Sequence, residues 1–151
     1  MALAAFGLVS ILLAGSAVVG HELVPGFLHP YLAAMSARRL AHVDAMLERV
    51  HASREDFDVR AQDGIVLRGW KIRAAAPNGD WVILLHGQGD NRAGMSGFAD
   101  FLLPAGYSIV MMDSRAQGES GGDEATYGWK ERYDTQAIVN ALESSEKVKH
   151  V

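Results

Sequence analysis

The chain opens with a long apolar segment. Residues 2–19 are apolar except for two serines and two glycines, and no charged side chain occurs before Glu22. A helix rises about 1.5 Å per residue, so a segment of this length just crosses a hydrocarbon core of ~30 Å. The pattern predicts a transmembrane helix over residues 1–20, through which the chain is bound to a membrane.

Two other interpretations of this segment stay open. A signal peptide could be cleaved near the small residues Ala14, Gly15 and Ser16, but no lysine or arginine precedes the apolar run. A buried core helix is disfavoured because nothing polar marks a solvent face. We therefore favour a retained, single-pass anchor. Arg38 and Arg39 follow it, and by the positive-inside rule they favour a cytoplasmic location for the rest of the chain.

A second region, residues 21–55, separates the anchor from the main domain. Two prolines and a glycine within residues 21–30 indicate a connector. Residues 31–52 then show a helical spacing of apolar side chains, which predicts an amphipathic helix with the apolar positions Leu32, Met35, Leu40, Val43, Leu47 and Val50. This helix lies either at the membrane surface or against the domain that follows, and we favour the second arrangement.

From Asp56 onward the periodicity changes from helical to alternating. Residues 57–60 alternate between apolar and polar side chains, residues 62–64 are typical of a turn, and residues 65–73 alternate less regularly. These patterns predict an antiparallel hairpin. Residues 81–85 are then five apolar residues in a row, which is typical of a strand buried on both faces of a sheet.

A helix, a strand and a second helix follow this buried strand. Asp90 or Asn91 can cap the first helix, whose expected core face holds Met95, Phe98, Phe101 and Leu102. Residues 107–112 form the next apolar strand, and residues 129–145 form the second helix. Strands that alternate with helices indicate an α/β fold with a mostly parallel sheet, and residues 56–151 are expected to be its domain.

Composition narrows the possible functions. The chain of 151 residues carries a formal net charge of −4, which gives no support to nucleic-acid binding. It contains no cysteine, so disulfides, thiol catalysis and thiolate metal sites are excluded. None of its six histidines is paired at helical spacing, and we expect neither a metal site nor a cofactor.

The candidate chemistry lies in two loops that follow buried strands, where ligands of open α/β sheets bind. The first loop holds the run His86, Gly87, Gln88 and Gly89. The second carries Asp113, Arg115, Gly118, Ser120 and Gly122. Together they resemble the loops after the third and fourth strands of α/β-hydrolases, and most of all those of membrane-anchored, dienelactone-hydrolase-like, esterase-like and peptidase-like members. The resemblance extends from Phe57 to the C-terminus, with Ala116 standing where the family usually has glycine.

The resemblance implies an oxyanion hole in the first loop. In the family, the backbone N–H at the position of Gln88 points at the oxyanion, and the glycines at Gly87 and Gly89 let the substrate approach. One such donor contributes about 10²–10³ in rate when a nucleophile is present. His86 is then expected to support the loop rather than act as a general base. The same structural role is expected for Asp113, Arg115, Gly118 and Ser120.

The catalytic nucleophile is not expected in this chain. Residues 118–122 match the pattern Gly-x-Ser-x-Gly, but a nucleophile elbow joins a strand directly to a helix, whereas Ser120 lies within a long polar loop. The only histidine that follows is His150. Residues 147–151 are typical of the approach to a further strand, which in the family carries the catalytic serine.

We therefore expect an incomplete α/β-hydrolase domain: an N-terminal hairpin, the first parallel strands and two helices, preceded by the transmembrane and amphipathic helices. Its complete form would be a serine hydrolase of small ester or related acyl substrates. The chain itself lacks the triad and is expected to be inactive alone. The strand at residues 81–85 should form an open sheet edge, through which the chain could self-associate.

Two other functions stay open. A non-catalytic, membrane-anchored module could bind a partner through the open sheet edge. A dinucleotide-binding half-domain is suggested by Gly87 and Gly89 after a strand, with Asp113 at the end of the next strand. Arg92 occupies the place of the third glycine of that motif, which makes the dinucleotide alternative the weaker one.

Overall fold

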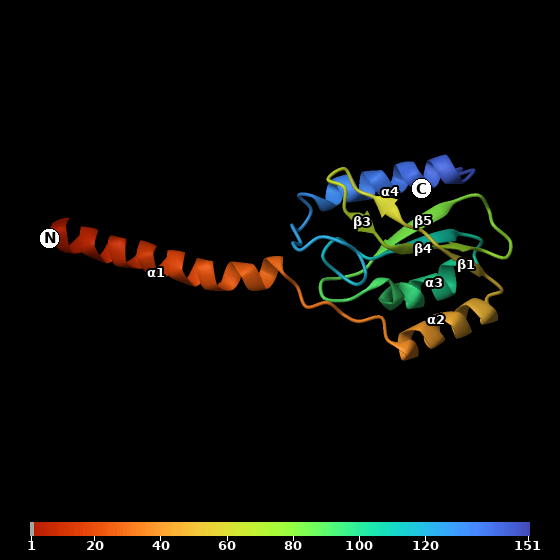
Figure 1. Cartoon of the computed structure of the whole chain (residues 1–151), viewed down its shortest axis with the longest axis horizontal. Coiled ribbons are helices and arrows are strands. Elements are labelled where there is room, and N and C mark those ends of the chain that lie inside the picture. Colours follow the sequence, from red (N-terminus) through yellow and green to blue (C-terminus); the bar gives the residue numbers. More distant parts are fainter. Residues whose placement is uncertain (1) are drawn as a thin grey trace.

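A computed structural model describes residues 2–151 as an α/β domain from which one long helix projects (Figure 1). This helix, α1, extends over Ala2–Leu28. Its part Val9–Leu28 has 20 residues with a mean hydropathy of 1.6, none of it is buried in the protein, and it is long and apolar enough to cross a membrane. The apolar N-terminal helix predicted from the sequence is therefore present.

Helix α1 is longer than the sequence pattern predicts. The prediction of a connector over residues 21–30 is wrong for residues 21–28, because the helix continues through Pro25 to Leu28. His29 N still donates to Pro25 O at 2.8 Å. A proline removes its own N–H from the helical hydrogen bonds and crowds the carbonyl four residues before it, and transmembrane helices tolerate both effects. The connector is limited to residues 29–36, which form no regular element.

The second helix, α2, covers Ala37–Arg49 and is shorter than the predicted range of 31–52. It begins where the Ser36 side chain accepts a hydrogen bond from Arg39 N, which satisfies one of the free donors of the first turn. Its buried residues Val43, Met46 and Leu47 pack in one cluster with the sheet. The prediction that this helix packs against the following domain is confirmed.

The main sheet has four strands in the order β1-β4-β6-β5. They cover Ser53–Asp56 (β1), Gly69–Arg73 (β4), Ser108–Met112 (β6) and Trp81–Leu85 (β5). Strand β4 is antiparallel to β1 and β6, and β5 is parallel to β6 with Trp81 opposite Ser108. The sheet is thus mixed, and its parallel pairing joins the two apolar strands that the sequence predicts.

A separate hairpin precedes β4, as predicted. It pairs β2 (Val59–Arg60) with β3 (Val66–Leu67), and Ala61 N donates to Ile65 O across the turn at 2.9 Å. Strand β1 was not predicted, because its sequence Ser-Arg-Glu-Asp has no apolar alternation. It forms the outer edge of the sheet, where exposed polar side chains are expected.

Helices cover both faces of the sheet (Figure 1). On one face, α2 and α3 (Ser96–Leu102) pack against Trp70, Ile72 and Met111. On the other face, α4 (Glu131–Ser145) places Ile138 and Leu142 against Val110 and Met112. All five residues of β6 are buried, which explains the uninterrupted apolar run in that strand.

The predicted core face of the first domain helix is wrong for its two aromatic residues. Phe98 and Phe101 are 53% and 61% exposed, with their ring centroids 6.1 Å apart. A 3₁₀ turn, η1 (Arg92–Met95), precedes α3. The side of the helix that faces the core instead holds Met95, Ala99, Leu102 and Leu103, which have ordinary helical spacing, and the two phenylalanines lie outside this face.

Strand β5 lies at the open edge of the sheet, where the sequence predicts an unpaired strand. Leu85 at its end is 45% exposed. The last residues of the chain reach only the start of this edge: Trp81 N donates to His150 O and Lys149 N donates to Gly79 O, both at 2.9 Å. Asp80 and His150 form an isolated parallel bridge at this end of β5.

Candidate active site

The loop after β5 presents one backbone donor to solvent. The N–H of Gln88 has no hydrogen-bond partner in the described part of the chain, and the residue is exposed. A side chain at Gly87 would meet no atom within 4 Å, so the space beside this residue is open to a ligand. Gly89 has φ +73°, a conformation that side chains rarely adopt. The loop therefore combines a free donor, open space and a backbone turn that favours glycine.

Two side chains hold this loop in place. Gln117, from the loop after β6, accepts from Gly89 N at 2.7 Å and donates through Nε2 to Gln88 Oε1 at 3.1 Å. His86 is buried, and its Nε2 accepts from Ser114 N at 3.1 Å. Its Nδ1 is then the protonated nitrogen and donates to Gly87 O at 2.8 Å. Both ring nitrogens of His86 are engaged, which leaves no free nitrogen for a general base.

Gln117 was missed by the sequence analysis. A glutamine in a polar loop carries no periodic or motif signal, and its role depends on the approach of two loops that lie 28 residues apart in the chain. The two loops that the sequence motif singles out do come together in the structure. They meet because β5 and β6 are neighbours and run in parallel, so that their carboxyl ends share one sheet edge.

Asp113 joins the two loops through hydrogen bonds to both of them. Its carboxylate is buried and accepts from Arg92 N at 2.6 Å, from Glu119 N at 2.8 Å and from the Arg92 guanidinium. A Cβ at Gly118, where φ is +55°, would overlap this carboxylate. Glycine at 118 is thus required both by the backbone conformation and by the space that Asp113 occupies.

Arg92 is the buried partner of Asp113 and a second residue whose role the sequence did not indicate. It is 5% exposed, its guanidinium also bonds Glu119, and it lies over the ring of Trp70 at 4.4 Å. Because this pair uses the carboxylate of Asp113 inside the protein, the carboxylate is not available to a ribose hydroxyl. The geometry therefore argues against the dinucleotide-binding alternative.

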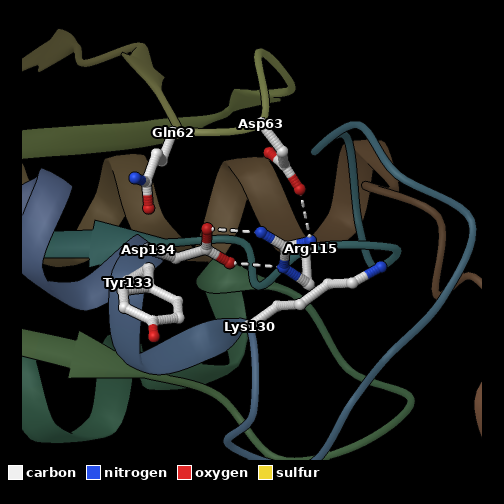
Figure 2. Close-up of a pocket in the computed structure, with 6 residues that line it drawn as sticks. All are labelled: Gln62, Asp63, Arg115, Lys130, Tyr133 and Asp134. Carbon is white, nitrogen blue, oxygen red and sulfur yellow. Dashed lines mark hydrogen bonds and ion pairs between the residues drawn. The ribbon is translucent and has the colours of Figure 1, made fainter.

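Arg115 braces the second loop against α4 (Figure 2). Its Nε and Nη2 donate to the two carboxylate oxygens of Asp134 at 2.6 and 2.7 Å, and Nη1 donates to Asp63 at 2.9 Å. The hydrogen bond to Asp134, with that to Asp63, raises the pKa of Arg115 against the opposing effect of burial. The hydrogen bond from Arg115 in turn lowers the pKa of Asp63.

A cavity of about 220 Å³ lies beside this brace, lined by Gln62, Asp63, Arg115, Lys130, Tyr133 and Asp134 (Figure 2). The charged groups of Arg115, Asp63 and Asp134 in its wall are paired with one another. Bidentate pairing of this kind fixes the geometry of the loop. We assign the brace a structural role.

Ser120 does not lie in the environment of a nucleophile. Its Oγ donates to Asp113 O at 2.7 Å and accepts from Arg68 N at 2.8 Å, and no helix begins between Ser120 and Glu131. No hydrogen bond joins Ser120 to a histidine among residues 2–151. His150 instead contacts Asp80 at 2.8 Å, at the other end of β5.

Ala116 adopts a left-handed backbone conformation that favours glycine. It has φ 53°, a left-handed value that costs an alanine about 1–2 kcal/mol, and its methyl group is buried.

In the described residues no group of three or more histidine or acidic side chains could hold a metal ion.

The helices and the mixed four-stranded sheet match part of the structures of α/β-hydrolases. No family model and no curated protein matches the sequence. The structures found to be similar include further hydrolases, such as an α/β-hydrolase of Vibrio vulnificus (19% identity over 72% of this chain and 35% of that chain, TM-score 0.53), which shows the fold alone. Matches of 30% and 33% identity to an esterase support a relationship to the α/β-hydrolase superfamily over part of the chain.

The fold is esterase-like. One crystal form of the Pyrococcus furiosus esterase Pf2001 matches with 30% identity over 80% of this chain and 44% of the esterase, at a TM-score of 0.63. A second crystal form matches with 33% identity over 68% of this chain and 41% of the esterase, at a TM-score of 0.61. The chain thus spans less than half the length of the esterase it resembles.

Proposed function

We propose that this chain is the N-terminal part of a membrane-anchored serine hydrolase that acts on esters or related acyl substrates. In this proposal the chain supplies the oxyanion hole through the backbone N–H of Gln88. Residues outside positions 1–151 supply the nucleophile, acid and base. The observation that carries the proposal is the free N–H of Gln88 in a loop held on both sides by Gln117 and His86.

The sheet edge supports a position for the proposed nucleophile. His150 pairs with Asp80 in the parallel sense, so a strand that continues from it would run beside β5 at a spacing of about 4.8 Å. The carboxyl end of that strand would lie next to the loop that holds Gln88. A serine there could attack a carbonyl whose oxygen accepts from the Gln88 N–H, which is the geometry that stabilises a tetrahedral oxyanion.

Two assays test the catalytic part of the proposal. The purified chain should show no serine-dependent hydrolysis of p-nitrophenyl esters, with Ser120→Ala as the control. Turnover that Ser120→Ala abolishes would overturn the assignment of Ser120 as a structural residue. The gene should encode a Gly-x-Ser-x-Gly sequence in any frame shortly after the codon for Val151, and fluorophosphonate should label that serine in the longer protein.

The oxyanion hole is tested in the same longer protein. Gln88→Pro removes the backbone donor, and we expect kcat to fall by about 10²–10³ with a much smaller change in KM. Gln88→Ala keeps the donor and loses only the side chain, so it should retain far more of the activity. Equal losses in the two variants, at matched melting temperatures, would contradict a role for the backbone N–H.

The N-terminal helix is proposed to be a retained anchor rather than a cleaved signal, with the domain on the cytoplasmic side. If the helix is retained, the protein should float with membranes and keep the mass of the full chain. Because the chain has no cysteine, Ser144→Cys gives a single label site on the exposed surface of α4. A membrane-impermeant maleimide should label it only after cells are lysed, and labelling of intact cells would place the domain outside.

The open edge of β5 supports a second function, an interaction module that pairs with another chain or with a second copy. An unpaired strand edge offers backbone donors and acceptors to any chain that can add a strand. Co-purification of a second chain that carries a nucleophile elbow would favour this function over the first.

A further inference from the structure

The end of α1 is joined to the loop that follows β6. Tyr127 Oη donates to Phe27 O and Ala125 N donates to Leu28 O, both at 2.7 Å. His29 Nδ1 forms a third hydrogen bond, with Asp123 O. These contacts hold the loop at the level of the last turn of the apolar helix.

The connector after α1 is joined in the same way to the loop that follows β5. Asn91 Nδ2 donates to Ala33 O at 3.0 Å, and Asn91 Oδ1 accepts from Arg39 at 3.1 Å. Both loops at the carboxyl ends of the parallel strands are therefore attached to the chain where it leaves α1. Figure 1 shows that α1 projects from the side of the domain on which these loops lie.

Exposed aromatic side chains occur along the segments that these contacts join and in the adjoining start of α4. We call them the aromatic surface: Phe27, Tyr31, Tyr127, Trp129 and Tyr133. Trp129 is 66% exposed, whereas Trp70 and Trp81 are only 3% and 4% exposed. Tryptophan and tyrosine are the side chains that concentrate at membrane–water interfaces, because one part of the ring is apolar and another is polar.

The charges at the aromatic surface also suit the headgroup region. The guanidinium of Arg132 lies over the rings of Trp129 and Tyr133 at 4.2 and 4.6 Å. Arg132 Nη2 donates to Tyr133 Oη at 2.9 Å, but no ion pair joins Arg132 to a carboxylate among the described residues, so the remaining donors of its guanidinium are available to a lipid phosphate. The neighbouring Lys130 is paired with Glu124 at 3.5 Å. A single free cation among aromatic rings fits zwitterionic headgroups better than a strongly anionic surface.

We propose that the aromatic surface lies in the headgroup region of the bilayer and holds the carboxyl edge of the sheet toward the membrane. This inference rests on the proposed anchor. Strand β5 and the loop of Gln88 then face the bilayer at a short distance, and substrates of the proposed hydrolase would be amphiphilic esters that reach the loop from the lipid phase.

Tryptophan quenching by brominated lipid tests this orientation in the full chain. We reconstitute the chain in phosphatidylcholine vesicles that carry bromine on the acyl chains near the headgroup. The emission of Trp129 should be quenched and shifted to shorter wavelength, and the quenched component should disappear in Trp129→Phe. Because Trp70 and Trp81 are buried in the domain, their emission should remain.

A second variant controls for proximity caused by the anchor alone. Ser144→Trp in the Trp129→Phe background places an exposed tryptophan in the last turn of α4, and we expect no quenching there. Equal quenching at positions 129 and 144, or none at 129, would overturn the proposed orientation while leaving the anchor intact. If the chain fails to float with the vesicles, both the anchor and the aromatic surface are overturned. A blue-shifted but unquenched Trp129 would mean that protein covers this surface, and would also overturn the proposal.

Discussion

Replacement of Asp113 by alanine should destabilise the domain far more than replacement of any exposed aspartate. The change removes the carboxylate that accepts from the Arg92 backbone and guanidinium and from Glu119 N. Arg92 would remain in a site where it is 5% exposed, without its buried partner. Breaking a buried ion pair in this way costs about 3–5 kcal/mol, most of it from the charge left behind.

For Asp113→Ala, the remaining contacts of Arg92 indicate a decrease in the free energy of unfolding near the lower end of this range. Glu119 still bonds the Arg92 guanidinium, and Trp70 still lies against it. We therefore expect a decrease of about 3 kcal/mol in the free energy of unfolding. A domain of this size is stabilised by only about 5–15 kcal/mol, so the change should shift the whole transition.

The assay is urea unfolding of the full chain in non-ionic detergent at pH 7, followed by tryptophan emission. Asp58→Ala is the matched control, because Asp58 also bonds an arginine, Arg68, but both side chains are about half exposed. Such a pair contributes less than about 1 kcal/mol. The double variant Arg92→Met with Asp113→Leu should recover much of the loss, since it removes both charges. Similar midpoints for Asp113→Ala and Asp58→Ala would refute the role of the Asp113 carboxylate in joining and stabilising the two loops.

Three further predictions concern other parts of the domain. Burial raises the pKa of Glu146, but hydrogen bonds from Lys71 and Arg73 outweigh it and lower this pKa below the ordinary value of 4.5. The stability that ionised Glu146 contributes is complete above pH 4.5 and is lost as the pH falls through its lowered pKa. Glu146→Gln should therefore be less stable than the parent chain at pH 7 and approach it at low pH. A difference in urea midpoint that stays constant with pH would contradict this. Ala116→Gly should change the free energy of unfolding by less than about 1 kcal/mol, because release of left-handed strain is offset by the lost methyl burial and by a more flexible unfolded chain; a large loss in the same urea assay would show that no strain is stored there. Leu85→Lys should decrease any self-association seen by light scattering, because Leu85 lies at the open edge of β5. The control Phe98→Lys changes an exposed residue of α3 and should leave self-association unchanged. If both variants decrease self-association equally, the edge of β5 is not the interface.

The sequence predicted the parts of the fold whose signal is local. Five apolar residues before a glycine-rich loop are enough to identify β5, and the spacing of Asp113, Gly118 and Ser120 identifies the loop after β6. The structure adds the reason for one of these residues, since Asp113 fills the space that a side chain at 118 would need.

Other parts depend on partners that are distant in the chain and could not be predicted. Strand β1 is polar and exists only because β4 lies beside it. Gln117 and Arg92 act through Gly89 and Asp113, which come from different loops. Phe98 was placed in the core because it is large and apolar, whereas the helix turns the small Ala99 beside it toward the sheet.

The attachment of both loops to the end of α1 has a kinetic consequence for the proposed hydrolase. With the Gln88 loop held at a fixed height above the bilayer, the enzyme would sample substrate by lateral diffusion in two dimensions. Turnover would follow the mole fraction of ester in the membrane rather than its concentration in the bulk solution. Dilution of the vesicles with inert lipid would slow the reaction, whereas dilution of the vesicle suspension with buffer would leave the rate per enzyme unchanged.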